Sequence, residues 1–131
     1  DLRIEAYRRL AAVTTPDEVE AIRTEWQDRY GPVPEPGEGL LSVASLRAEC
    51  SRLGIREIVV NDGGGFGGPA LMARLSPVVL KESQKIRLKR LVPKAVHKPD
   101  DTLVLPLARK SDPGGDLVTA LRELVPRSDD Q

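Results

Sequence analysis

The stretch Thr14–Tyr30, TTPDEVEAIRTEWQDRY, decides how the N-terminal half of the chain folds. Thr15 followed by Glu18 is a capping box, in which the threonine hydroxyl accepts from the Glu18 amide and the carboxylate reaches back to the Thr15 amide. Pro16 occupies the first helical position, where its missing N–H is not needed. The pattern therefore predicts a helix that ends at Gly31.

Two stripes run side by side along this predicted helix. Apolar residues recur at helical spacing and predict a buried face, at Val19, Ile22, Trp26 and Tyr30. Beside them, Glu25, Asp28 and Arg29 stand at i, i+3 and i+4 and form a compact mixed-charge cluster. Exposed ion pairs at this spacing usually serve solubility, so the spacing leaves open whether the cluster docks onto a partner.

Composition places the chain among soluble globular proteins. Its 131 residues and 14.3 kDa are the size of one domain, with 40% hydrophobic and 31% charged residues. Lys and Arg number 20, as do Asp and Glu, so no overall field attracts the chain to nucleic acid or to an anionic membrane. The apolar runs are too short to span a bilayer, and the first residues of this sequence do not show a signal-peptide pattern.

Cysteine usage and the start of the sequence bear on compartment and context. Cys50 is the only cysteine, which excludes an internal disulfide and is typical of a reducing cytoplasm. The sequence begins at Asp1, without an initiator Met, and enters a helical pattern at once. We therefore expect a cytoplasmic fragment of a larger protein, with no membrane contact.

The first part of the chain is expected to be helical. Helices are predicted over Leu2–Ala12, Thr15–Tyr30 and Pro36–Leu53, with Gly54 as the C-terminal cap of the third. The third helix has a wide apolar face that predicts burial, made of Leu40, Leu41, Val43, Ala44, Leu46, Cys50 and Leu53.

After Gly54 the period of the apolar residues changes. Strands are predicted over Ile55–Val60 and Ala70–Leu80, then a hairpin of Ala95–Lys98 and Leu103–Leu107, and then a last helix capped by Asp116. Glu82–Leu91 reads as a helix or a strand; its composition and a capping Ser83 favour the helix.

The resulting order is three N-terminal helices followed by a small, mostly antiparallel sheet in the order ββαββα, which is an α+β fold. We expect one domain over residues 1–126, with 1–14 as the end of a linker and first helix. Residues 127–131 are expected to be a disordered tail.

The glycine-rich run Gly63–Gly68 is a candidate phosphate loop by composition only. A P-loop needs Lys and then Ser or Thr after its last glycine, whereas Pro69 and Ala70 follow here. A dinucleotide-binding loop opens a helix, and here a strand pattern follows. The run therefore indicates a flexible hairpin connection.

The segment Lys81–Lys98 is strongly basic, with Glu82 as its only acid. Clustered cations can neutralise phosphates, so nucleic-acid contact is predicted as an alternative function. The candidate contacts are Lys85, Arg87, Lys89 and Arg90. The segment has no Phe, Tyr or Trp on which bases could stack, and an ordinary solvated face explains the same pattern.

No arrangement of residues indicates catalysis or metal binding. His97 is the only histidine, and with Cys50 it cannot fill a four-ligand zinc site. No GxSxG motif and no close carboxylate pair within an apolar run occurs. We therefore expect no catalytic residue, no metal site and no cofactor in this chain.

The N-terminal motifs resemble one known family. The stretch IEAYRRLAAVTTPDEVEAIRTEWQDRYGPVPEP, followed by GLLSVASLRAECSRLGIREI, is similar to the C-terminal domain of the bacterial transcription-repair coupling factors (Mfd). The resemblance covers Ile4–Ile58, and the second half of the chain matches only in the order of its elements. The Arg- and Ala-rich usage is typical of an actinobacterial source.

The resemblance implies a regulatory, non-catalytic domain. In the family the parent protein is an ATP- and Mg²⁺-dependent, helicase-like DNA translocase that removes stalled RNA polymerase and recruits the excision-repair protein UvrA. Its C-terminal domain docks onto the N-terminal UvrB-like module of the same polypeptide, which masks UvrA binding and restrains the motor. The family's docking motif, E-x-x-D-R, falls on Glu25, Asp28 and Arg29 of this sequence. Partners implied for the parent are UvrA, RNA polymerase and DNA.

Overall fold

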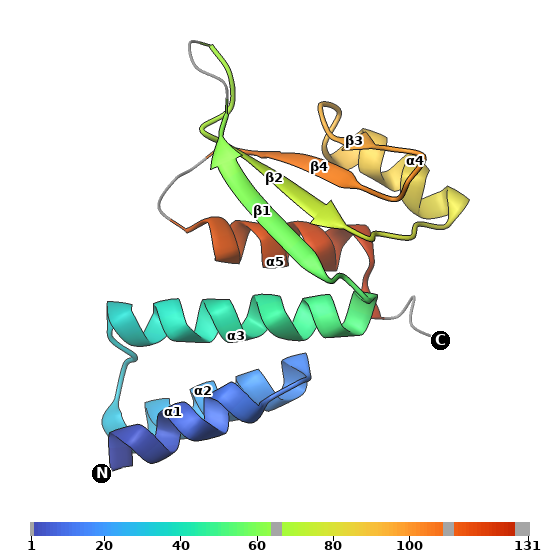
Figure 1. Cartoon of the computed structure of the whole chain (residues 1–131). Coiled ribbons are helices and arrows are strands. Elements are labelled where there is room, and N and C mark those ends of the chain that lie inside the picture. The colour runs from blue at the N-terminus through green and yellow to red at the C-terminus, as the bar shows by residue number, and fades with distance from the viewer. Residues whose placement is uncertain (1, 64–66, 109–111, 128–131) are drawn as a thin grey trace.

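Three helices precede a small sheet that is itself covered by two further helices (Figure 1). The structure, a computed structural model, describes residues 2–63, 67–108 and 112–127. The elements are α1 (Leu2–Ala12), α2 (Pro16–Tyr30), α3 (Glu35–Leu53), β1 (Glu57–Asp62), β2 (Leu71–Ser76), α4 (Glu82–Leu91), β3 (Val96–His97), β4 (Leu103–Leu107) and α5 (Pro113–Leu124). The predicted α+β class and the ββαββα order are confirmed.

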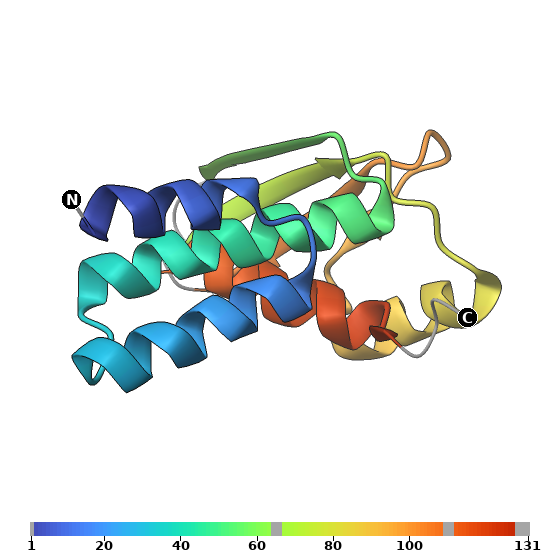
Figure 2. The same ribbon diagram turned by 90° about the horizontal axis from the view of Figure 1, so that it is seen from below.

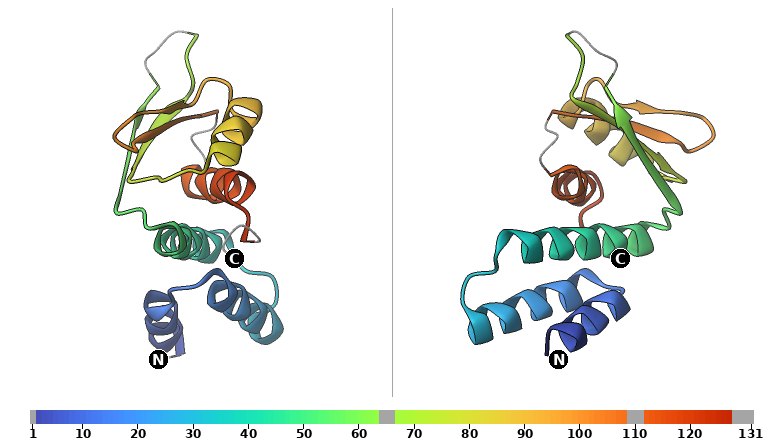
Figure 3. Two further views of the ribbon diagram at one scale, coloured as in Figure 1. Left: turned by 90° about the vertical axis from the view of Figure 1, so that its right-hand side faces the viewer. Right: turned by 60° about the vertical axis from the view of Figure 1, so that its left-hand side comes forward.

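The four strands form one antiparallel sheet with the order β1-β2-β4-β3. Strand β2 pairs with β1 on one side and with β4 on the other, so β1 and β3 are the edge strands of the sheet. Helices α4 and α5 both lie on one side of this sheet (Figure 3, left). The inward residues of β2 and β4 are buried because period-2 alternation points them at α5.

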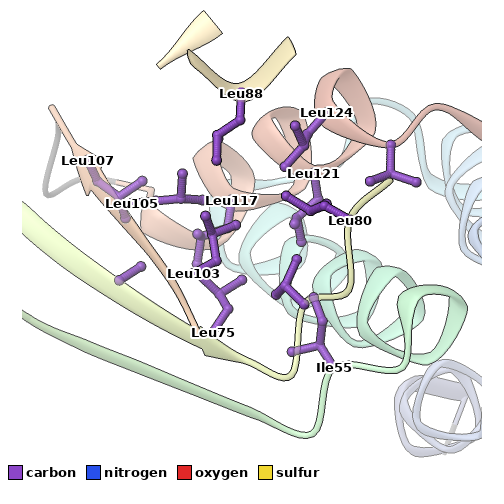
Figure 4. Packing of buried hydrophobic residues seen from close by; sticks show 13 residues of the cluster. Ile55, Leu75, Leu80, Leu88, Leu103, Leu105, Leu107, Leu117, Leu121 and Leu124 are labelled. Carbon is purple, nitrogen blue, oxygen red and sulfur yellow. The ribbon is translucent and has the colours of Figure 1, made fainter. Parts of the chain in front are cut away.

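The larger core lies between the sheet and α5 (Figure 4). Leu75 and Leu103 on the strands and Leu117 and Leu121 on α5 are the largest side chains buried there, each no more than 1% exposed. Each such leucine contributes about 2 kcal/mol by leaving water. The buried face of α5 is made of Leu117, Val118, Leu121 and Leu124.

A second, smaller core joins the first three helices, which lie side by side when seen from below (Figure 2). Val19 and Ile22 of α2 pack against Leu41, Ala44 and Ala48 of α3. Helix α3 lies between the α1–α2 pair and α5 (Figure 3). Its other side, with Leu46, Cys50 and Leu53, packs on the larger core.

Local sequence signals explain where α2 and α3 begin and end. The hydroxyl of Thr15 accepts a hydrogen bond from the Glu18 amide (3.3 Å) and donates one to the Glu18 carboxylate (2.9 Å). The Glu18 carboxylate therefore reaches back to the Thr15 hydroxyl. Gly54 ends α3 with φ 76°, a left-handed conformation that only glycine adopts without strain.

Two expected caps in the second half are wrong. Helix α4 is confirmed as a helix, but its N-cap is Lys81, whose amide donates to Oε1 of Gln84 at 2.8 Å. Helix α5 begins earlier than expected, because Asp112 accepts from the Gly115 amide at 3.0 Å. Asp116 lies in the first turn, where its charge still favours the helix dipole.

Arginines connect helices that are distant in sequence. Glu49 of α3 is fully buried, and its carboxylate pairs with Arg52 (2.7 Å) and with Arg122 of α5 (2.9 Å). Arg127, expected in the tail, forms two hydrogen bonds with Asp17 at 2.7 and 2.8 Å, and residues 128–131 lie outside the described residues. None of the described helices combines the length and apolar character needed to cross a bilayer.

Candidate functional site

The outer surface of α2 carries the charged cluster, and α1 contributes to it. The Glu25 carboxylate pairs with Arg9 of α1 through one oxygen, and its other oxygen lies 3.9 Å from Nε of Arg29. The Glu25 side chain is 30% exposed and that of Arg29 is 59% exposed. The structure thus brings two of the three expected residues together and adds Arg9, which the spacing within one helix did not reveal.

Asp28 lies on the same part of α2 and is exposed. Among the described residues it makes no side-chain hydrogen bond or ion pair. An exposed carboxylate without an internal counter-charge is available to a partner at little desolvation cost.

A groove of about 500 Å³ runs beside this cluster. Its walls include the three aromatic residues Tyr7, Trp26 and Tyr30, together with residues 31–34 of the connector and Pro36 and Gly37 of α3. Glu25 and Arg29 each precede one of these aromatic residues, so the charged and aromatic stripes are about 100° apart on the helix and run in parallel.

Tyr30 was expected in the core, and that expectation is wrong. Its side chain is 60% exposed, whereas Val19 and Ile22 on the same stripe are buried. Tyr30, in the last turn of α2, lines the groove together with the proline-rich connector, so the stripe passes from core to groove along the helix. Tyr7 is also exposed, at 47%, so both tyrosines of the groove present surface to solvent.

Two of the four candidate nucleic-acid contacts in the basic segment have partners within the protein. The guanidinium of Arg87 donates to the Leu124 carbonyl at the end of α5 (2.7 Å), and Lys85 pairs with Glu82 (3.3 Å). Lys89 and Arg90, which lie four residues after Lys85 and three residues after Arg87 on α4, are exposed. Of the four candidate nucleic-acid contacts, Arg87 is thus engaged in holding two helices together.

The other reactive side chains are placed as ordinary structural residues. Nε2 of His97 donates to the Val78 carbonyl at 2.7 Å and lies 3.6 Å from the Asp101 carboxylate. Burial, and then the charge of Glu49, raise the pKa of the Cys50 thiol. Within the described ranges no three His, Cys, Asp or Glu side chains gather as a metal site would require.

The fold defines the class of this molecule: an α+β domain in which a three-helix unit precedes a four-stranded antiparallel sheet. Its fold is similar to the crystal structure of the C-terminal domain of a transcription-repair coupling factor, with a TM-score of 0.63 over 92% of this chain and 74% of that chain. The two sequences are 13% identical, so this likeness concerns the fold.

Residues 1–68 match the model of the TRCF domain family. Because the match spans half of the chain, and because the relatives below agree with it, the chain belongs to the TRCF domain family. The transcription-repair-coupling factor of Mycobacterium bovis is 37% identical over 134 residues, which is 92% of this chain. That of Escherichia coli is 41% identical over 63 residues, which is 48% of this chain. The chain spans about a tenth of the Mycobacterium bovis protein (10%).

Proposed function

We propose that this chain is a non-catalytic regulatory domain of a cytoplasmic transcription-coupled DNA repair translocase. It docks through the α2 surface onto the N-terminal UvrB-like module of the same polypeptide, masks UvrA binding and restrains the motor. ATP and Mg²⁺ would act in the motor domains of the parent, which also meets RNA polymerase and DNA. The observation that carries the proposal is the charged cluster beside an aromatic groove, both within the family-matched residues 1–68.

The chemistry of this surface suits a contact that must release. Aromatic residues in a groove supply apolar contact area with little loss of side-chain entropy. The ion pair of Glu25 with Arg9 and the exposed Asp28 supply directional, salt-sensitive contacts at the rim. A surface that is part apolar and part charged can hold a partner while keeping bound and released states within a few kcal/mol.

The test is a calorimetric titration of this chain with the separately expressed UvrB-like module. Glu25→Lys, Asp28→Lys and Arg29→Glu are compared with Lys89→Glu, an exposed charge reversal on α4. We expect saturable binding that weakens at least tenfold in the α2 variants and is unchanged in Lys89→Glu. Thermal unfolding of each variant is measured in parallel, because a joint loss of stability and binding would make the cluster structural.

DNA serves as the titrant in a second arm. The alternative function, nucleic-acid contact by residues 81–98, is weakened by the engagement of Arg87 with the Leu124 carbonyl. Strong salt-dependent DNA binding that is lost in Lys89→Glu, together with no binding to the module, would replace the docking proposal with this alternative.

A further inference from the structure

The second candidate surface is the face of the sheet that points away from the helices. Helices α4 and α5 cover one side of the sheet, and no described element covers the other (Figure 3, left). Alternation along the strands assigns side chains to this outer face. They are Glu57, Val59 and Asn61 of β1, Met72, Arg74 and Ser76 of β2, Val96 of β3, and Val104 and Pro106 of β4.

The strand register arranges these side chains in rows. Val59 pairs with Arg74, Arg74 with Val104, and Val104 with Val96, so one row crosses all four strands. The neighbouring row is Asn61, Met72 and Pro106. Cross-strand neighbours in such rows have Cβ atoms about 5 Å apart, so the two rows form one continuous surface.

This outer face is more apolar than a solvated sheet face requires. Val59 is 38% and Val96 is 51% exposed, and Met72, Val104 and Pro106 are partly exposed between them. Antiparallel sheets with one solvated face usually alternate apolar inside and polar outside. Here five of the seven positions in the two rows are apolar, with Asn61 and Arg74 as the exceptions, and a patch of this kind is typical of a contact surface.

Arg74 is the charged residue in the middle of the first row. It is exposed, and its side chain makes no hydrogen bond or ion pair with the described residues. The other arginines that lie against apolar surface, such as Arg52 and Arg87, hold carboxylates or helix-end carbonyls. The Arg74 guanidinium, flanked across the strands by Val59 and Val104, offers a planar, bidentate site for a carboxylate, and a partner that covered these valines would exclude water from it.

The same residue argues against a second copy of this chain as the occupant. Two outer faces packed symmetrically would place the central Arg74 of each copy near the other, and like charges at the centre of an interface cost several kcal/mol. We propose that the outer face of the sheet binds another polypeptide, through an apolar surface that carries one carboxylate opposite Arg74. This site is separate from the α2 surface and does not depend on the function proposed for it.

The test uses a defined probe, a helical peptide with leucines at i, i+3, i+4 and i+7 and one glutamate at the centre of that face. A matched peptide has lysine in place of the glutamate. In ¹⁵N NMR titrations we expect the glutamate peptide to shift the amides of Val59, Arg74 and Val104 saturably. Arg74→Glu should weaken this binding about tenfold and transfer the preference to the lysine peptide, while Lys89→Glu, the control on α4, leaves both affinities unchanged.

A second measurement does not depend on the peptide. Arg74→Val removes the central charge, so sedimentation should show a concentration-dependent dimer for this variant and a monomer for the unchanged chain. Equal affinity of the two peptides, shifts confined to other elements, or a monomeric Arg74→Val variant with unchanged unfolding temperature would each overturn the proposal.

Discussion

Oε1 of Glu49 on α3 accepts a hydrogen bond from Nε of Arg122 on α5, 2.9 Å away and 73 residues later in the chain. The other oxygen of the same carboxylate accepts from Nε of Arg52 at 2.8 Å. Glu49 has no exposed surface, so its charge is balanced entirely within the protein. The ion pair of Glu49 with Arg122 therefore joins α3, in the three-helix unit, to α5, which packs against the sheet.

Replacing Glu49 tests how much this buried pair contributes. Glu49→Gln keeps the shape but leaves Arg52, whose side chain is 8% exposed, without that carboxylate. We expect the free energy of unfolding in urea to fall by about 3 kcal/mol, because breaking a buried pair leaves an uncompensated charge. Glu57→Gln on the exposed face of β1 is the matched control and should change it by less than about 0.5 kcal/mol.

Arg87 and Lys89 on α4 separate a structural cation from a solvated one. Arg87→Ala removes the donor to the Leu124 carbonyl, and we expect a loss of about 2 kcal/mol in urea unfolding. Lys89→Ala should leave stability unchanged within about 0.5 kcal/mol. Equal effects of the two substitutions would show that the contact at the end of α5 contributes nothing.

Two glycines of the α3 region should respond to alanine in opposite directions. Gly54 has φ 76°, and Gly54→Ala is strained there although nothing lies within 4 Å of the added methyl. The unfolding temperature of the Gly54→Ala variant should fall, by an amount that corresponds to a loss of about 1 kcal/mol in the free energy of unfolding. Gly39 lies inside the helix with the same open space, so Gly39→Ala should raise stability by about 0.5 kcal/mol or more.

The contact of Asp17 with Arg127 predicts a pH dependence. Hydrogen bonds from Arg127, and then its charge, hold the pKa of the Asp17 carboxyl below its ordinary value of 3.8. A lowered pKa means that the contact stabilises the fold above the ordinary pKa and that this contribution disappears as the pH falls through the folded pKa.

Thermal unfolding of the unchanged chain and of Asp17→Asn at pH 2 to 7 measures that contribution. Near pH 7 the unchanged chain should have a higher unfolding temperature than Asp17→Asn. The two unfolding temperatures should converge near pH 2. The difference should also shrink in high salt, because both side chains are exposed. A difference that stays constant down to pH 2 would contradict the assignment.

Features that depend on neighbouring residues in sequence were predictable. Thr15 caps α2 and Gly54 ends α3 because both rely on contacts within one turn. The period of the apolar residues located the elements, and β1 is shifted by two residues toward the glycine-rich loop. Ser83 and Asp116 were wrong as caps, since Gln84 and Asp112 form the hydrogen bonds instead.

Burial along α3 was only partly predictable. Leu41 and Ala44 are buried, but Val43, also assigned to the apolar face, is 61% exposed and Leu40 is 40% exposed. A helix that contacts neighbours on two sides has a burial pattern that depends on where those neighbours stop. Glu49 is buried because an arginine 73 residues away meets it, which no local pattern contains.

In the candidate site, too, contacts within one helix were predictable from the sequence, and contacts between segments were not. The i, i+4 spacing correctly indicated that Glu25 and Arg29 lie together. The contribution of Arg9 required the packing of α1 beside α2, and the groove required the connector to turn back past Tyr30. Any role of these residues in docking stays a prediction until the titration is done.

Helix α3 forms part of both cores, and this has a consequence for synthesis on the ribosome. Everything that the smaller core needs has been translated once Leu53 has emerged, and its contacts are short in sequence, which favours rapid closure. The larger core must wait for Leu117 and Leu121, near the end of the chain. A nascent chain stalled before α5 would therefore have a closed helical unit and an open, leucine-lined sheet, the state most in need of a chaperone.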